Sequence, residues 1–320
     1  MIVLGIETSC DETGVAVVRS GKEVLSNEVF TQIEIHKAYG GVVPEVASRH
    51  HIEKITYVMD AAIKKANLTF EDIDLIAVTG NPGLVGSLMV GINAAKAVAL
   101  AYNKPIVFVN HIHGHIYANY IEDDFLFPLL ALVVSGGHTE LILMRDHFQF
   151  EILGETLDDA VGEAYDKVAR VVGAGYPGGP IIDKMAKQGE ASYALPKIML
   201  DKDSLNFSFS GLKSAVINLV NKHKMKNEEI NPNDLAASFQ EAAISVLVEK
   251  TIKAATEHEV KQVVVAGGVA ANSHLREEMA QAISALPGVK LSIPKMKYCT
   301  DNAAMIAVAG YFQYLHEHKH

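Results

Sequence analysis

Hydrophobic and polar positions along the chain form two blocks with the same order. In the first block, short apolar or alternating runs predict three strands, and an apolar stripe with helical spacing predicts a long helix after them. A buried strand, a glycine-containing loop over 79–83 and a small-residue helix complete the block. The predicted strands and helices cover residues 2–6, 15–18, 23–29, 45–66, 75–78 and 84–102.

The second block begins near residue 129 and repeats the pattern of the first rather than its residues. Three strands are predicted first, then several helices, and finally a strand, a glycine loop and a helix. These three strands cover 130–134, 141–144 and 148–154, and the later strand and helix cover 262–265 and 273–283. Two such halves predict an α/β protein with a duplicated fold and a central cleft, which the strand-to-helix loops face.

The length of 320 residues agrees with two domains, each with its own core. We predict a first lobe over 1–106, joined by the C-terminal helix over 302–320, and a second lobe over 107–301. Hydrophobic residues make up 49% and charged residues 21% of the chain, which excludes a disordered protein.

Several features of the sequence predict a cytoplasmic protein that does not span a membrane. The first residues lack the pattern of an export signal, and the most apolar stretch, 83–101, is interrupted by Asn93 and Lys96. With two cysteines, a disulfide framework is excluded. The net charge of −10 opposes binding to phosphate backbones, so a nucleic-acid role needs a local basic run, such as 222–226, or a basic partner.

Three histidines, His111, His113 and His115, follow a predicted buried strand over 106–109. On a helix, His111 and His115 share one face, and such a pair can bind one transition metal while leaving positions for a carboxylate and a substrate. Surface histidines without a ligand are the competing interpretation. A zinc peptidase of the His-Glu-x-x-His type is disfavoured, because Ile112 stands where its general base would be.

A third metal ligand could come from Asp301. The same residue could instead cap the helix that follows, and the sequence alone does not separate these two roles.

Four glycine-rich turns, over 79–83, 135–138, 173–179 and 266–268, predict ligand contacts, because glycine lets backbone N–H groups approach a phosphate or sugar. Tight turns without a ligand are the alternative for each one. The 173–178 run fits a dinucleotide fingerprint, but a helical pattern precedes it, so a Rossmann site is excluded. Phosphate-loop and serine-hydrolase motifs are also missing from the sequence.

Three polar residues each have a structural explanation. Asp166 could form an ion pair with Arg170 on one helix face. Asp183 could be stabilised near the N-terminus of a helix by the positive end of the helix dipole. Asn272 could cap the helix after it.

Six strings of residues, in order along nearly the whole chain, resemble the TsaD family, formerly called O-sialoglycoprotein endopeptidase. His138 resembles the bacterial branch of that family. The strings are Gly5-Ile-Glu-Thr-Ser-Cys-Asp-Glu-Thr13, His111-Ile-His-Gly-His115, Ser135-Gly-Gly-His-Thr139, Tyr176-Pro-Gly-Gly-Pro180, Phe207-Ser-Phe-Ser-Gly-Leu-Lys213 and Ala266-Gly-Gly-Val-Ala-Ala-Asn272.

The resemblance implies an actin-like ATPase (RNase H-like) fold and an acyltransferase. The expected reaction moves a threonylcarbamoyl group from threonylcarbamoyl-AMP to N6 of the adenosine at position 37 in tRNAs that read codons starting with A. The family implies Fe²⁺ or Zn²⁺ on His111, His115 and Asp301, and Mg²⁺ with bound nucleotide. It also implies a role for Asp11 and Glu12 near the phosphates. The implied adenylate pocket consists of Val133, Val134, Ser135, Gly136, Gly137, Asp166, Gly179, Asp183 and Asn272.

The family further implies tRNA as a partner, with TsaB and TsaE homologues, and a TsaC/Sua-type synthase that supplies the adenylate. Two other hypotheses compete. A small-molecule kinase would share the duplicated fold and the glycine loops, but it would not need the histidine pair. A silent scaffold would keep the fold without bound metal or adenylate.

Overall fold

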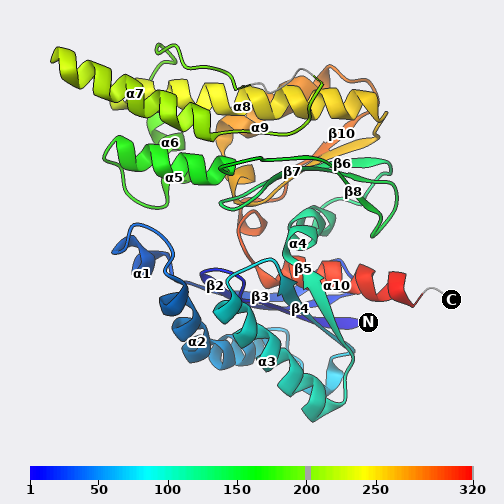
Figure 1. Ribbon diagram of the computed structural model, residues 1–320. Helices are drawn as coiled ribbons and strands as arrows, with labels where there is room; N and C mark the ends of the chain where they lie inside the picture. The colour runs from blue at the N-terminus through cyan, green and yellow to red at the C-terminus, as the bar shows by residue number, and fades with distance from the viewer. Residues whose placement is uncertain (199–202, 319–320) are drawn as a thin grey trace. The chain divides into compact units, whose positions relative to one another are not determined.

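The computed structural model describes residues 1–198 and 203–318, and these residues form two compact units. Unit 1 comprises Met1–Phe125 and Pro294–His320, of which the last two residues lie outside the described part. Unit 2 comprises Leu126–Ile293. Each unit has its own sheet and its own helices (Figure 1).

Unit 1 contains a five-stranded sheet with the order β3-β2-β1-β4-β5. β1, β2 and β3 are antiparallel neighbours, whereas β4 runs parallel to β1 and β5 parallel to β4. The strands are β1 (Ile2–Glu7), β2 (Glu12–Arg19), β3 (Glu23–Thr31), β4 (Leu75–Asn81) and β5 (Ile106–Asn110). Apart from the partly buried Ile2, the hydrophobic side chains of β1, β2 and β4 are fully buried, so these strands form the centre of the core.

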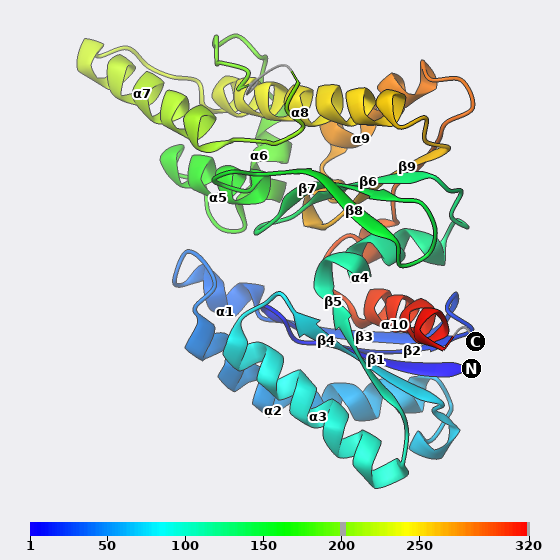
Figure 2. The same ribbon diagram turned by 45° about the vertical axis from the view of Figure 1, so that its right-hand side comes forward.

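Helices cover both faces of this sheet. α2 and α3 lie on one face, and α10 lies on the other, as two views show (Figures 1 and 2). The five helices of unit 1 that the structure describes are α1 (Ile33–Lys37), α2 (Pro44–Lys65), α3 (Val85–Tyr102), α4 (His111–Tyr117) and α10 (Ala303–Glu317).

Among the described residues, α3 is the one helix that is long and apolar enough to cross a membrane by length and composition, with a mean hydropathy of 1.4. One such helix is weak support for a membrane span. In unit 1, α3 packs against α2 and β4 along one side.

Unit 2 repeats the sheet of unit 1. Its order β10-β9-β6-β7-β8 again places three antiparallel strands beside two parallel ones. The strands are β6 (Leu129–Val134), β7 (Thr139–Met144), β8 (Phe150–Glu155), β9 (Gln262–Ala266) and β10 (Lys290–Ser292). The described helices are α5 (Val161–Val171), α6 (Gly178–Ala186), α7 (Ser210–Lys226), α8 (Pro232–Glu257) and α9 (Ser273–Ser284).

The matching strand orders confirm the predicted duplication. The boundaries of the units differ from the predicted lobes, because residues 107–125 and 294–301 belong to unit 1. The reason is that β5 pairs with β4 inside the first sheet, and α4 follows β5 directly and packs on α10. Two short elements, α1 and β10, were not predicted, because neither is long enough to show a period.

Candidate functional site

The histidine pair lies at the start of α4, where a strand turns directly into a helix. β5 ends at Asn110, and the side chain of Asn110 accepts hydrogen bonds from the backbone N–H groups of Ile112 (2.8 Å) and His113 (3.2 Å). This is an N-cap, and it fixes the first turn of the helix. The helical prediction for residues 111–115 is therefore confirmed, and His111 and His115 lie one turn apart on one face.

The two imidazole rings converge on one carboxylate. His111 Nε2 and His115 Nε2 are 3.1 Å apart, and Asp301 Oδ1 lies 3.4 Å from the first and 3.1 Å from the second. The three ligand atoms all lie within 4.8 Å of one another. Both histidines are buried, and the Asp301 side chain is 19% exposed.

The alternative role of Asp301 as a helix cap is wrong. The N-cap of α10 is its neighbour, Asn302, whose side chain accepts a hydrogen bond from the backbone N–H of Met305 at 3.2 Å. Because Asn302 caps the helix, the Asp301 carboxylate is free to face the histidines.

Three glycines bring the start of α10 close to this site. A Cβ on Gly5 would lie 2.3 Å from the backbone oxygen of Ala303, and a Cβ on Gly114 would lie 2.7 Å from Cδ1 of Ile306. A Cβ on Gly14 would lie 3.1 Å from the nitrogen of Ala303. These glycines let β1, β2 and α4 approach α10, and Asp301 immediately precedes this helix.

Nearby groups hold Asp301 in its anionic form. Burial alone would lower the pKa of His111, but Asp301 and Glu7 raise it well above its ordinary value. Burial would likewise raise the pKa of Asp301, but both histidines hold it well below its usual range. The anionic form of Asp301 is therefore favoured at neutral pH, and this form is the one that binds a cation.

Asp11 and Glu12, the predicted acidic pair, lie in unit 1, where Asp11 ends the turn between β1 and β2 and Glu12 begins β2. Asp11 is buried, and Glu12 accepts a hydrogen bond from Thr31 Oγ1 at 3.2 Å. Burial and the charges of Asp301 and Asp11 raise the pKa of Glu12 well above its usual value. Glu12 therefore favours the protonated form more than an exposed glutamate does.

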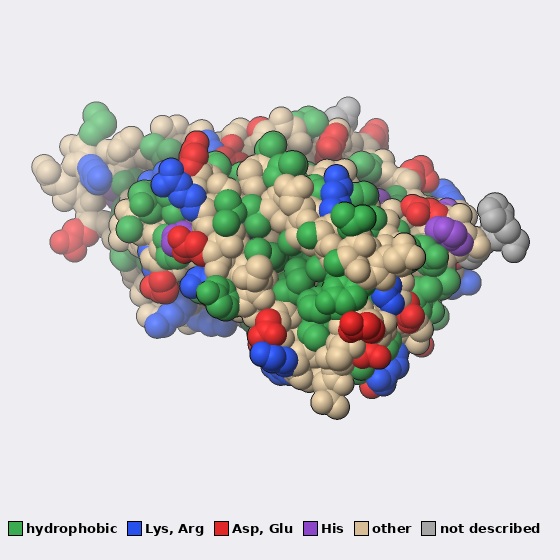
Figure 3. Space-filling model, turned by 90° about the horizontal axis from the view of Figure 1, so that it is seen from below, with side chains coloured by type: hydrophobic (Ala, Val, Ile, Leu, Met, Phe, Trp, Pro, Cys, Tyr) green, Lys and Arg blue, Asp and Glu red, His purple; other side chains and the backbone are tan. Residues whose placement is uncertain are grey.

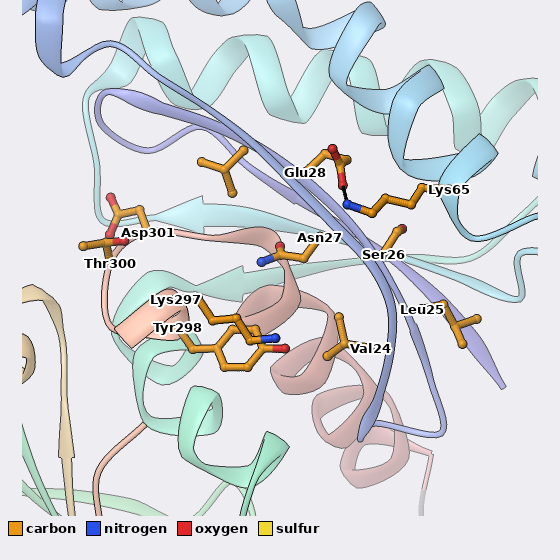
Figure 4. Close-up of a pocket in the computed structure, with 11 residues that line it drawn as sticks. Val24, Leu25, Ser26, Asn27, Glu28, Lys65, Lys297, Tyr298, Thr300 and Asp301 are labelled. Atoms are coloured by element: carbon orange, nitrogen blue, oxygen red, sulfur yellow. Dashed lines mark hydrogen bonds and ion pairs between the residues drawn. The ribbon is translucent and has the colours of Figure 1, made fainter. Parts of the chain in front are cut away.

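A pocket of about 590 Å³ adjoins the cluster at Asp301 (Figure 4). It runs beside β3 and is lined by residues of β3, Lys65 at the end of α2, and the segment from Lys297 to Asp301. Lys65 is paired with Glu28 at 2.6 Å, and Lys297 lies over the Tyr298 ring. The residues predicted for the adenylate belong to unit 2 and do not line this pocket.

In unit 2, the predicted glycine loop is the turn that joins β6 to β7. The backbone N–H of His138 donates to Ser135 Oγ at 3.0 Å, which closes the turn. A Cβ on Gly136 or Gly137 would meet nothing within 4 Å, so both face open space. The side chains of Val133 and Val134 are fully buried, so these two could reach a ligand through the backbone alone.

Asp166, on α5, lies beside the predicted glycine-rich turn over 173–179, which leads into α6. Asp166 Oδ1 accepts a hydrogen bond from the backbone N–H of Gly178 at 2.7 Å. A Cβ on Gly178 would lie 2.7 Å from Asp166 Cα, whereas a Cβ on Gly179 would meet nothing within 4 Å. Gly178 therefore serves the close packing of α6 on α5, and Gly179 is exposed to a potential ligand.

Asp183 and Asn272 are linked through the start of α9. Asp183 Oδ1 accepts a hydrogen bond from Ser273 Oγ at 2.8 Å. Asp183 lies beyond the first turn of α6, which begins at Gly178, so its predicted role at the helix dipole is wrong. Asn272 caps α9 by accepting from the N–H of Leu275 (2.9 Å), and its Nδ2 donates to Gln240 Oε1 at 2.7 Å. The cap prediction for Asn272 is confirmed.

The donor set of the cluster fits a transition metal. Two imidazole nitrogens and one carboxylate oxygen are ligands that suit Fe²⁺ and Zn²⁺, and three protein ligands leave further positions for a substrate. The two Nε2 atoms face each other at 3.1 Å, and a cation would accept both lone pairs at once.

Sequence reasoning missed Glu7 and Thr79. Glu7 Oε2 lies 3.0 Å from His111 Nδ1, and Thr79 Oγ1 donates to the same oxygen at 2.6 Å. Glu7 stands inside the string Gly5 to Thr13 and directly follows the apolar strand predicted over 2–6, and this position is the one signal that could have indicated it.

Comparison with known proteins gives matches along nearly the whole chain. The family described as "TsaD: tRNA N6-adenosine threonylcarbamoyltransferase" matches residues 23–308. A Bacillus subtilis protein named tRNA N6-adenosine threonylcarbamoyltransferase is 60% identical over 310 residues, covering 97% of this chain and 90% of its own length. A Staphylococcus carnosus protein of the same name is 58% identical, covering 98% and 91%.

Solved structures share the fold at low identity. HypF of T. kodakarensis has a TM-score of 0.67 at 15% identity, covering 99% of this chain and 48% of its own. Component A of the (R)-2-hydroxyglutaryl-CoA dehydratase of Acidaminococcus fermentans has a TM-score of 0.57 at 15% identity, covering 98% of both chains. These likenesses confirm the duplicated actin-like ATPase fold, and at this identity they give the kinase hypothesis no support.

Proposed function

Because the chain belongs to the TsaD family, the tRNA N6-adenosine threonylcarbamoyltransferases, we propose that His111, His115 and Asp301 hold one Fe²⁺ or Zn²⁺ ion in its active site. The enzyme is an acyltransferase that makes threonylcarbamoyladenosine in tRNA. The observation that carries the proposal is the convergence of the two Nε2 atoms and Asp301 Oδ1 within 4.8 Å.

The acyl donor in this proposal is threonylcarbamoyl-AMP, bound at the loops of unit 2. Gly136, Gly137 and Gly179 offer backbone surface that no Cβ blocks, which suits phosphate and acyl oxygens. The carboxylates of Asp166 and Asp183 are acceptors for ribose hydroxyl groups. Asp166 accepts a hydrogen bond from Gly178, and Asp183 accepts from Ser273 and pairs with Lys187 at 3.3 Å; these contacts orient the two carboxylates.

A bound cation would supply Lewis acidity, which contributes several kcal/mol in enzymes that use metal-ion catalysis. Residues of the protein would also contribute through their charges. Asp301 holds a negative charge in a buried site, where its attraction for a cation is stronger than in water. The family implies a role near phosphates for Asp11 and Glu12, which belong to unit 1, and Mg²⁺ with bound nucleotide would offset the charge of an ionised carboxylate there.

The proposed protein partners are TsaB and TsaE homologues, and unit 1 offers a surface for one of them. Large hydrophobic side chains are exposed on α2 and α3, and the view of this side shows hydrophobic groups gathered among scattered charges (Figure 3). A surface of this kind marks a protein interface. The exposed residues are Ile52, Tyr57, Val85, Met89 and Leu100. We assign this surface to the TsaB homologue.

The acidic net charge of −10 also favours a partner. The basic residues at 64, 65 and 295 are paired with carboxylates of Asp60, Glu28 and Glu122, so they offer little free charge to phosphates. A composite surface with partner proteins would supply the missing positive charge for tRNA. We place the reaction in the cytoplasm, with a TsaC/Sua-type synthase that supplies the adenylate.

The test is product formation by the reconstituted system. Purified protein, its partners, tRNA, threonine, bicarbonate and ATP should make threonylcarbamoyladenosine, measured by mass spectrometry of digested tRNA. His111→Ala should lower the rate by about 100-fold or more, because losing metal catalysis costs several kcal/mol. His316→Ala, an exposed histidine near the end of α10, is the matched control and should keep the full rate. An unchanged rate in His111→Ala would refute the metal proposal.

A further inference from the structure

Glu7 is a carboxylate at the end of β1 with no solvent-exposed surface. Burying a charged carboxylate is costly unless hydrogen bonds compensate for the lost water. Its two oxygens receive three donors. The backbone N–H of Ser9 donates to Oε1, Thr79 Oγ1 donates to Oε2 at 2.6 Å, and His111 Nδ1 lies 3.0 Å from the same Oε2.

The contact with His111 decides which ring nitrogen can bind a cation. A carboxylate accepts hydrogen bonds and donates none, so the Nδ1 atom facing Glu7 must carry the proton. In the neutral ring, which is the form that binds a metal, the other nitrogen, Nε2, has its lone pair free, and it is the atom that faces His115 and Asp301. The ring planes of the two histidines lie at 83°, so His111 is also held at a defined angle.

We infer that Glu7 is a positioning residue for the reaction: it holds His111 in the tautomer and orientation in which Nε2 binds the metal. This inference rests on the proposed function, because it concerns the same metal centre. Partners of this kind, one step removed from the metal, raise the affinity of a site by 10- to 100-fold in other proteins.

The second histidine is held differently. Among residues 1–198 and 203–318, the structure gives His115 Nδ1, which is buried, no hydrogen-bond partner. The ring of His115 is therefore fixed by packing and by its Nε2 contacts, whereas His111 has an anchoring carboxylate. The orienting effect of Glu7 should act on His111 alone.

Ser9 is the competing partner, because Ser9 Oγ lies 3.2 Å from the same Nδ1 of His111. A hydroxyl can donate or accept, so it does not enforce either tautomer. A second competing role for Glu7 is structural, since its bond with Thr79 joins the ends of β1 and β4. The variants below separate these roles.

The test uses the full chain and the metal alone. Co²⁺ and Zn²⁺ are titrated into metal-free protein, and affinity is measured by visible absorption of bound Co²⁺ and by competition with a zinc chelator. Glu7→Gln should weaken binding by about 10- to 100-fold. The amide must turn its oxygen toward the N–H of Ser9, which leaves its NH₂ group facing His111 Nδ1 and favours the wrong tautomer.

Two variants are matched controls. Ser9→Ala removes the competing hydroxyl and keeps the carboxylate, and Thr79→Val removes the bond between the strands and keeps the contact with His111. Both should bind metal within about threefold of the parent. If Ser9→Ala loses affinity while Glu7→Gln keeps it, or if Thr79→Val loses as much as Glu7→Gln, the inference is wrong.

A measurement on the unchanged protein covers the case in which Glu7→Gln fails to fold. In the Zn²⁺-bound parent, labelled with ¹⁵N at histidine, the His111 ring should show a protonated Nδ1 and a metal-bound Nε2. His111→Ala identifies the signal. A metal-bound Nδ1 would overturn the inference. Failure of the parent to bind either metal would instead refute the proposed metal centre, so the two failures are distinguishable.

Discussion

At the scale of single residues, two adjacent positions can have different roles, one in the fold and one at a proposed site. Asn302 caps α10, and the adjacent Asp301 is left to face His111 and His115. Gly178 and Gly179 form a second pair of this kind. The first packs against Asp166, and the second faces open space. One residue of each pair builds the fold, and the other is available to a ligand.

The glycine pair gives a matched prediction. Gly178→Ala places a methyl group 2.7 Å from Asp166 Cα, so backbone must shift, and the free energy of unfolding should fall by about 1–3 kcal/mol. Gly179→Ala should leave stability unchanged or slightly higher, because alanine favours a helix. It should weaken binding of a non-hydrolysable adenylate analogue. Urea unfolding and calorimetry measure the two effects, and equal stability losses would contradict this division.

Which of two adjacent residues has which role could not be predicted from the sequence. Asp and Asn are both good N-caps, so the choice between Asp301 and Asn302 depends on where α10 begins. The packing of Gly5 against Ala303 sets that point, and it joins residues almost 300 positions apart. The His111 and His115 pair was predictable, because four-residue spacing on a helix is a local property.

At the scale of elements, caps and turns fix the helices that frame unit 2. Asp158, which precedes α5, accepts hydrogen bonds from the N–H groups of Phe209 (2.8 Å) and Ser210 (3.1 Å) and from the hydroxyl of Ser210. These donors stand at the start of α7. The string from Phe207 to Lys213 thus has a structural role as the anchored beginning of a helix.

Asp158→Ala should destabilise the protein by about 1 kcal/mol near neutral pH, because alanine offers no acceptor to the N–H groups at the start of α7. Burial opposes the shift, but hydrogen bonds from Ser208, Phe209 and Ser210 lower the pKa of Asp158 below its ordinary value of 3.8. Its stabilising effect is therefore present above pH 3.8 and is lost as the pH falls through the lowered value. Urea unfolding of both proteins across this range should show the gap closing in acid; a constant gap would contradict the role.

Long elements were predictable and short ones were not. The strands of β1, β6 and β9 are continuous apolar runs, which a parallel or central strand requires, and α2 and α8 have clear starts at proline. The first helix of unit 2, α5, begins only at Val161, because residues 156–159 form an irregular segment in which the N–H of Leu157 donates to the backbone oxygen of Phe207.

At the scale of the whole molecule, the proposed sites divide between two units. The proposed metal ligands and their anchor Glu7 belong to unit 1, and the proposed adenylate contacts belong to unit 2. The duplicated sheets explain this arrangement, since each copy supplies its own turn between its first two strands. In unit 1 that turn carries Asp11 and Glu12, and in unit 2 it carries Ser135 to Gly137.

The measurement that tests the central claim most directly is the metal content of the anaerobically purified protein by elemental mass spectrometry. The claim predicts about one iron or zinc per chain in the parent and in His316→Ala, and a loss of most of this metal in His115→Ala and Asp301→Ala, with all four proteins folded by circular dichroism. A parent without transition metal, or ligand variants that keep it in full, would contradict the claim.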